Sequence, residues 1–426
     1  MKKFLALIIA LVMALSLVAC GEQKQPDNPD VPDDGQQTAT VKVGFITLHD
    51  ENSTYDLNFI NAAKEAIANL GLTDADYILK TNVPEGQECY ETAMNLVDEG
   101  CNIIFADSFG HEPYMIDAAK KHPEVQFCHS TGTRAHTENL ANYHNAFASI
   151  YEGRYLAGIA AGLKLNEMIE AGKFTADEAK MGYVGAFTYA EVVSGYTSFF
   201  LGARSVCPTV TMDVTFTGSW YDETLEKEGA EKLIQGGCKL ISQHADSLGA
   251  PTACENAGVP NVSYNGSTKD SCPNTFIVSS RIDWAPYYEM CIKAVMDGTE
   301  IPADWTGTLA TGSVVLTDVN ETAAAAGTAE AIAAATEKLE KGEIHVFDCA
   351  NFTTKVDDKV NTFKADYLKL DETGHITSYM ADVDTDAAYT GDTEVIKDGY
   401  FAESEFRSAP YFDLQIDGIN LLDTAM

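Results

Sequence analysis

The side chains best suited to bind a small molecule lie in the loops directly after the predicted β-strands. Aromatic residues alternate there with carboxylates, amides and hydroxyls, at Ser53, Tyr55, Asn58, Ser108, Phe109, Phe187, Trp220, His244, Asp246, Asn265, Asp283 and Trp284. Aromatic faces stack on flat rings, and carboxylates accept hydrogen bonds from hydroxyl or amino groups. We therefore predict a binding site for a flat, polar, uncharged ligand, such as a heterocycle bearing a sugar. Phe109 fits the core and the cleft equally well, whereas Phe187 follows a short glycine-containing strand end and fits the cleft.

No catalytic or cofactor-binding motif accompanies these residues. The chain lacks the phosphate-binding glycine loop, the dinucleotide fingerprint, the G-x-S-x-G nucleophile turn and the H-E-x-x-H zinc motif. No histidine pair has helical spacing with a third ligand, so neither a metal nor another cofactor is predicted. Catalysis needs a positioned acid or base with a tuned pKa, and the sequence shows none. The pattern indicates a binding protein and not an enzyme.

The charge balance excludes one class of partner. Lys and Arg total 28 against 64 Asp and Glu, a formal net charge of −36 over 426 residues. Such a charge repels phosphate backbones, so the sequence predicts no nucleic-acid binding. It equally disfavours docking to anionic lipid through a basic face.

The N-terminus predicts export and lipid attachment. Lys2 and Lys3 precede an apolar run from Phe4 to Val18, which is too short to span a bilayer comfortably, and the pattern is typical of a signal peptide over residues 1–19. Small residues before Cys20 resemble a bacterial lipobox, which would make Cys20 the lipid-attachment site. An ordinary signal peptide with an incidental cysteine is the alternative. Residues 20–40, rich in Pro, Asp and Gln, would then tether an extracytoplasmic body to the cell membrane.

Nine further cysteines follow Cys20, an odd number without C-x-x-C spacing. This pattern supports neither a zinc site nor a redox motif, and most of these residues are predicted to be small buried hydrophobes. The alternative is that some of them form one or two disulfides.

The remaining chain alternates strands and helices in two successive runs. This alternation predicts an α/β fold in which helices cover both faces of parallel sheets, with ligand between two similar lobes. We place lobe 1 at residues 41–150 with 279–315, and lobe 2 at 151–278 with 316–426. Residues 354–398 are polar and predict a β-rich insertion, and Phe406–Asp417 predicts a closing strand.

Five motifs in this order resemble the basic membrane protein (BMP) family of lipoproteins, which includes the purine nucleoside receptor A type. They are Glu152–Gly158, Gly182–Phe187, Ser219–Asp222, Gln243–Ser247 and Asp283–Tyr288. The resemblance implies a type I periplasmic-binding fold, with two Rossmann-like lobes, a hinge and a ligand cleft. It further implies a monomeric substrate-binding component of an ABC importer, which delivers a purine nucleoside or related purine to a permease.

The same resemblance assigns roles to individual residues. Phe187 matches one base-stacking position of the nucleoside receptors, and Tyr55 is the nearest match to the other. Asn265 stands where the family usually has the Asp that binds ribose, and Asp283 stands near a family Lys or Asn. A free base or another heterocycle therefore remains open. Two alternatives of other classes are a sugar-binding type I receptor and an envelope nucleoside hydrolase that uses Asp246 or Asp283.

Overall fold

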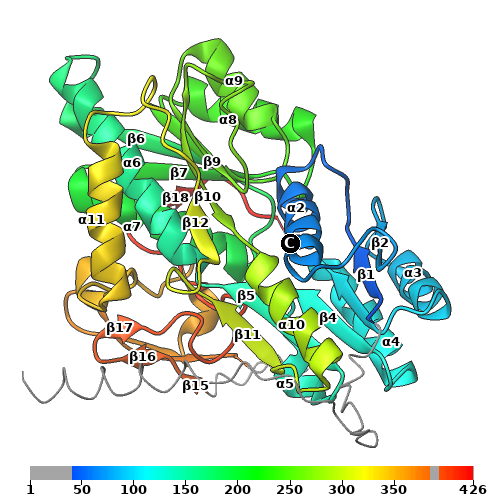
Figure 1. Cartoon of the computed structure of the whole chain (residues 1–426). Coiled ribbons are helices and arrows are strands. Elements are labelled where there is room, and N and C mark those ends of the chain that lie inside the picture. Colours follow the sequence, from blue (N-terminus) through cyan, green and yellow to red (C-terminus); the bar gives the residue numbers. More distant parts are fainter. Residues whose placement is uncertain (1–40, 384–392, 426) are drawn as a thin grey trace, which may run out of the picture. The chain divides into compact units, whose positions relative to one another are not determined.

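The computed structural model describes residues 41–383 and 393–425, and the signal peptide, Cys20 and the tether lie outside the described residues. Two sheets with covering helices form the body of the protein, and their strands are parallel except for one edge strand of the second sheet (Figure 1). This confirms the α/β class that the alternating pattern predicts.

The first sheet has the order β11-β5-β4-β3-β1-β2, and all its neighbouring strands are parallel. Its strands are β1 (Val43–Ile46), β2 (Tyr77–Lys80), β3 (Ile103–Ala106), β4 (Gln126–Ser130), β5 (Tyr143–Ala148) and β11 (Asp304–Gly307). Helices α2 (Thr54–Asn69) and α10 (Ala285–Asp297) pack on one face, and α3 (Gln87–Asp98) and α4 (Glu112–Lys121) pack on the other. Because successive side chains alternate across a strand, Phe105 enters the first of these cores and Ile104 the second.

The second sheet has the order β12-β10-β9-β8-β6-β7-β18, parallel except for β12. Its strands are β6 (Lys180–Gly185), β7 (Thr211–Phe216), β8 (Leu240–His244), β9 (Asn261–Tyr264), β10 (Phe276–Ile282), β12 (Val314–Leu316) and β18 (Ile419–Leu421). One core includes residues of α6 (Ile150–Glu170), α7 (Ala190–Val206) and α11 (Thr328–Glu340), and the other those of α8 (Glu223–Gln235) and α9 (Gly249–Ala257).

Glycines let α6 and α7 pack closely. A Cβ atom at Gly158 would lie 2.0 Å from the Phe199 carbonyl oxygen, and one at Gly202 would lie 2.0 Å from the Tyr155 carbonyl oxygen. The two helix backbones therefore touch at points where no larger residue fits. Gly158, the last residue of the Glu152–Gly158 motif, has this structural role.

The C-terminal region holds short antiparallel strands: β13 (Leu368–Leu370), β14 (Ile376–Ala381), β15 (Thr393–Glu394), β16 (Ile396–Lys397) and β17 (Tyr400–Phe401). The strand predicted at Phe406–Asp417 is wrong. Within the described residues that segment pairs with no strand, although Tyr411, Phe412 and Leu414 are buried, and the strand that joins the sheet is β18, a few residues later. The segment instead contacts Glu403, whose carboxylate accepts hydrogen bonds from the Tyr411 and Phe412 amides.

All nine cysteines after Cys20 lie within the described residues, and each is buried and free. Burial raises the pKa of Cys101 and Cys272 to about 11, which keeps these thiols protonated. The prediction of small buried hydrophobes is confirmed.

Candidate functional site

A pocket lies where the two sheets present the carboxyl ends of their central strands. Its lining residues are Leu48, Tyr55, Asp56, Ser108, Phe109, Thr131, Glu191, Trp220, His244 and Asp246. In each sheet the strand order reverses near this point, between β1 and β3 in the first sheet and between β6 and β8 in the second. Loops diverge at such a reversal, which leaves room for a ligand.

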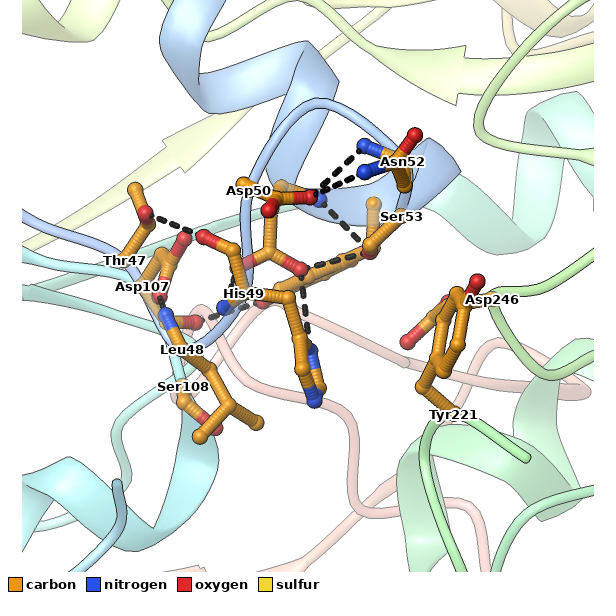
Figure 2. A network of polar contacts seen from close by, with 12 residues as sticks. Thr47, Leu48, His49, Asp50, Asn52, Ser53, Asp107, Ser108, Tyr221 and Asp246 are labelled. Atoms are coloured by element: carbon orange, nitrogen blue, oxygen red, sulfur yellow. Dashed lines mark hydrogen bonds and ion pairs between the residues drawn. The ribbon is translucent and has the colours of Figure 1, made fainter. Parts of the chain in front are cut away.

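The loop after β1 forms a polar network on one wall of the pocket (Figure 2). Ser53 caps α2, and its hydroxyl donates to Asp56 Oδ2 at 2.5 Å while accepting from the Asp56 amide. Asp56 Oδ1 accepts from the His49 amide at 2.7 Å. The Leu48 amide donates to Asp107 Oδ1 at 3.1 Å, which ties this loop to the end of β3. These bonds hold the loop rigidly beside the pocket.

The carboxyl groups around the pocket are shielded from water. Burial, and then the neighbouring Asp56, raise the pKa of Asp107 well above its usual value. Burial also raises the pKa of Asp246, with smaller contributions from Asp56 and Glu226. His244 lies 3.4 Å from Glu191, and burial lowers its pKa, so the ring is neutral. Because no Lys or Arg is among the lining residues, this pocket disfavours a phosphorylated ligand.

Hydrogen bonds and ring contacts join the loops of the first sheet to those of the second. The Thr54 amide donates to the Asp246 carbonyl at 3.0 Å, the His49 and Tyr221 rings lie 5.4 Å apart, and the Phe109 and Tyr189 rings lie 5.3 Å apart. Figure 2 shows Asp246 and Tyr221 facing the loop that holds His49 and Ser53. The pocket is thus covered by residues from both sheets.

An aromatic cluster borders the pocket on the side of the second sheet. Phe187 stacks on Tyr189 with ring centroids 5.0 Å apart, and it meets Trp220 edge-on at 5.0 Å. Trp220 itself lines the pocket, as does Phe109 from the other sheet. Such rings can stack on a planar ligand.

Half of the predicted site residues line this pocket: Tyr55, Ser108, Phe109, Trp220, His244 and Asp246. Ser53 and Phe187 are outside the lining: Ser53 caps α2, and Phe187 contacts the lining residue Trp220 edge-on. Asn265 donates to Asp246 Oδ1 at 3.4 Å from the adjacent strand end. The ligand contacts of all these residues stay predictions.

The remaining predicted residues lie away from the lining. Asp283 accepts from the Ala285 amide at the start of α10 and lies 3.4 Å from Arg281. Trp284 is buried in the first lobe's core, stacked on Phe59 at 4.6 Å. Asn58, on α2, is half-buried, and its amide nitrogen has no hydrogen-bond partner.

Four lining residues were not predicted: Leu48, Asp56, Thr131 and Glu191. Asp56 could have been found as the acidic third residue after a serine cap. Glu191 lies in the first turn of α7, directly beyond the aromatic loop that follows β6. Thr131 follows β4, and its sequence context offers no signal.

The described residues contain no group of three or more His, Cys, Asp or Glu that could hold a metal ion. Nor does any described helix combine the length and apolarity that a membrane crossing requires.

Two α/β lobes with a pocket between their strand ends define a type I periplasmic-binding fold. A solute-binding protein of an ABC transporter system from Conexibacter woesei shares this fold, with a TM-score of 0.59 and 19% identity over 72% of this chain and 98% of that one. A family model described as ABC transporter substrate-binding protein PnrA-like matches residues 44–348. The chain therefore belongs to this family, as its five motifs predict.

Two of the chain's relatives are about one third identical to it over the matched residues. A purine-binding protein of Brucella abortus is 33% identical over 262 residues, which span 61% of this chain and 70% of that protein. A Haloferax volcanii protein, provisionally named as the glucose-binding protein of an ABC transporter, is 34% identical over 207 residues, 48% of this chain and 49% of that protein.

Family membership establishes the general role of the chain. It is the extracytoplasmic substrate-binding component of an ABC transporter, with a small-molecule ligand and a membrane permease as partners. It is a binding protein and not an enzyme, so the hydrolase alternative is set aside.

Proposed function

We propose that this protein binds a purine nucleoside or a related purine in the pocket between its lobes and delivers it to its permease. The observation that carries this proposal is the pairing of aromatic rings with carboxylates around one pocket whose lining includes no Lys or Arg. Trp220 and Phe109 can stack on a base, while Asp56, Glu191 and Asp246 accept from amino and hydroxyl groups. The Brucella relative, named for purine binding, supports the same ligand class.

A thermal-shift panel tests the proposal. Inosine, adenosine, guanosine, hypoxanthine and adenine are compared with glucose, galactose and ribose, and calorimetry follows on each ligand that shifts the midpoint. A ligand that binds only the folded state stabilises it by RT ln(1 + [L]/Kd), about 2.7 kcal/mol at a hundredfold excess over Kd. A shift with purines alone supports the proposal. A shift with sugars alone would favour the alternative that the Haloferax relative's name suggests.

Replacing Trp220 with alanine should weaken purine binding tenfold to a hundredfold. Base–aromatic stacking is worth about 1–3 kcal/mol per base, and each 1.4 kcal/mol corresponds to about a tenfold change in Kd. The urea midpoint should change little, because Trp220 is only half-buried. Isothermal calorimetry and urea unfolding on the same variant measure both effects.

Two further alanine variants sharpen this test. Phe187→Ala should cause a smaller loss, because the Phe187 ring contacts Trp220 but does not itself line the pocket. A loss equal to that of Trp220→Ala would instead place Phe187 against the base. Phe406, an exposed aromatic residue outside the pocket lining, is the control, and Phe406→Ala should leave affinity unchanged. Unchanged affinity in Trp220→Ala contradicts the stacking role.

We further propose that the protein is a monomer attached to the cell membrane by lipid on Cys20. The lipobox-like residues before Cys20 and the polar tether after it support this arrangement. Cys20→Ser should release the protein from the membrane fraction, because the variant lacks the thiol that carries the lipid. Fractionation with immunodetection measures the release, and full retention of the variant in the membrane would contradict lipid attachment.

A further inference from the structure

Thr131 combines three unusual features within the pocket. It directly follows β4, it lines the pocket, and its side chain is 2% exposed. Its backbone φ is 73°, in the left-handed region. The other described non-glycine residues with positive φ are asparagine, aspartate or serine, whereas Thr131 is β-branched. A β-branched residue at such a φ is strained, and strain of this kind concentrates at functional sites.

The surrounding structure holds Thr131 in this conformation. Its amide donates to the Ala146 carbonyl at 2.8 Å. The next residue, Gly132, packs so tightly that a Cβ there would lie 2.1 Å from Asn145 Nδ2. Beyond it, the amides of Thr133 and Arg134 donate to the buried carboxylate of Glu112 at 2.8 and 2.9 Å. These contacts fix the backbone on both sides and keep the threonine at the pocket wall.

The hydroxyl of Thr131 has no hydrogen-bond partner. Burial raises the pKa of the nearby Tyr55 phenol, which already donates to the Asp107 carbonyl at 2.6 Å. The Ser108 hydroxyl is also committed, since it donates to Glu85 at 2.5 Å. The hydroxyl donors of Tyr55 and Ser108 are thus occupied, while that of Thr131 is free. A buried hydroxyl without a partner is unfavourable, so a ligand that pairs with it gains affinity.

We infer that Thr131 is a specificity-determining ligand contact, whose hydroxyl donates a hydrogen bond to an acceptor on the edge of the purine, a ring nitrogen or a carbonyl oxygen. This inference rests on the proposed purine function. The lining carboxylates can accept hydrogen bonds from donor groups of the ligand. Thr131 adds a hydroxyl that can donate a hydrogen bond to an acceptor group of the ligand.

The test uses Thr131→Val and Thr131→Ser, with inosine and hypoxanthine as probes in calorimetry and urea unfolding. Valine keeps the shape and the β-branch but removes the hydroxyl, so affinity should fall about tenfold while the urea midpoint holds or rises. Serine keeps the hydroxyl and should bind within about threefold of the unsubstituted protein.

Thr197→Val is the matched control. Thr197 is a fully buried threonine on α7 whose hydroxyl also lacks a partner, but it does not line the pocket. Its valine variant should bind both probes unchanged. Undiminished affinity in Thr131→Val, or an equal loss in Thr197→Val, overturns the inference and leaves the purine function intact. If the unsubstituted protein binds neither probe nor any other purine, the proposed function fails and the inference falls with it.

Discussion

Replacing Arg154 with methionine should lower the free energy of unfolding by about 3–5 kcal/mol, because several buried polar groups would lose their partner at about 1–3 kcal/mol each. Arg154, the arginine of the Glu152–Gly158 motif, is fully buried on α6. Its guanidinium donates to the Tyr183 hydroxyl at 2.6 Å and to the Ser242 hydroxyl at 3.2 Å. It also donates to the carbonyls of Gln243 and Ser263 at 3.4 Å.

The same substitution should weaken ligand binding. The Arg154 guanidinium lies over the Tyr264 ring at 4.8 Å, and Tyr264 contacts His244 with ring centroids 4.5 Å apart. His244 lines the pocket, so loss of the guanidinium removes a contact that holds Tyr264, and through it His244, in place. Arg154 is therefore a positioning residue, which acts on the ligand through Tyr264 and His244.

Urea unfolding and calorimetry measure the two effects of Arg154→Met. Arg154→Lys should recover only part of the stability, because an ammonium group cannot reproduce the spread of the guanidinium donors. Arg204→Met is the control: Arg204 is half-exposed on α7, lies over the Phe200 ring and bonds two backbone carbonyls. It should cost much less stability. A midpoint for Arg154→Met equal to that of the control contradicts this account.

The second large effect concerns the buried carboxyl of Glu226. Glu226 is fully buried on α8 and accepts hydrogen bonds from the Ser247 and Asp222 amides, directly beside Asp246 of the pocket. Burial raises its pKa from 4.5 to about 7. The folded state therefore holds this proton more tightly than the unfolded chain, and the resulting stability is present at low pH and lost as pH rises from about 4.5 to 7.

Glu226→Gln should remove this loss. The variant should match the unsubstituted protein near pH 4.5 and exceed its free energy of unfolding by up to about 3 kcal/mol at pH 8, since each pKa unit corresponds to about 1.4 kcal/mol. Urea unfolding from pH 4.5 to 8 measures the difference. Buried His111 and His144, with pKa values lowered to about 4 by burial, give the opposite slope, but they are present in both proteins and cancel.

Glu372→Gln provides the control for Glu226→Gln, because Glu372 is exposed on the turn between β13 and β14. Its difference from the unsubstituted protein should stay near zero at every pH. A difference for Glu226→Gln that does not grow with pH would show that this carboxyl is ionised in the folded state without cost.

Much of the fold was predictable from local sequence patterns. Strands such as Ile103–Ala106 are short, nearly continuous apolar runs, and each is followed by an amphipathic or small-residue helix. Strand β5 carries no such signal, because its run from Tyr143 to Ala148 is interrupted by His144 and Asn145, whose side chains find buried partners only in the folded sheet. Strand β11 also lacks an apolar run. It lies at the edge of the sheet, where its first three residues stay partly exposed.

Only half of the predicted site residues line the pocket, because the sequence does not show which loops meet. The strand–loop pattern by itself determined that ligand-binding side chains follow the strands, since parallel strands all end at the same edge. Only the strand order decided which loops meet. Those after β1, β3, β6, β7 and β8 lie near the two reversals and supply most of the lining, whereas the loop after β10 lies farther along the sheet and leaves Asp283 outside the lining.

The sequence by itself determined the α/β class, the binding role through the five family motifs, and a set of aromatic and carboxylate residues from which the pocket draws. Only the tertiary structure decided which aromatic residue became core and which became pocket. Trp284 packs on Phe59 of α2, whereas Phe109 remains 36% exposed at the pocket, although both follow strands. The physical reason is that a strand-end side chain is buried or left open by the neighbour that packs on it, and that neighbour comes from a distant part of the chain.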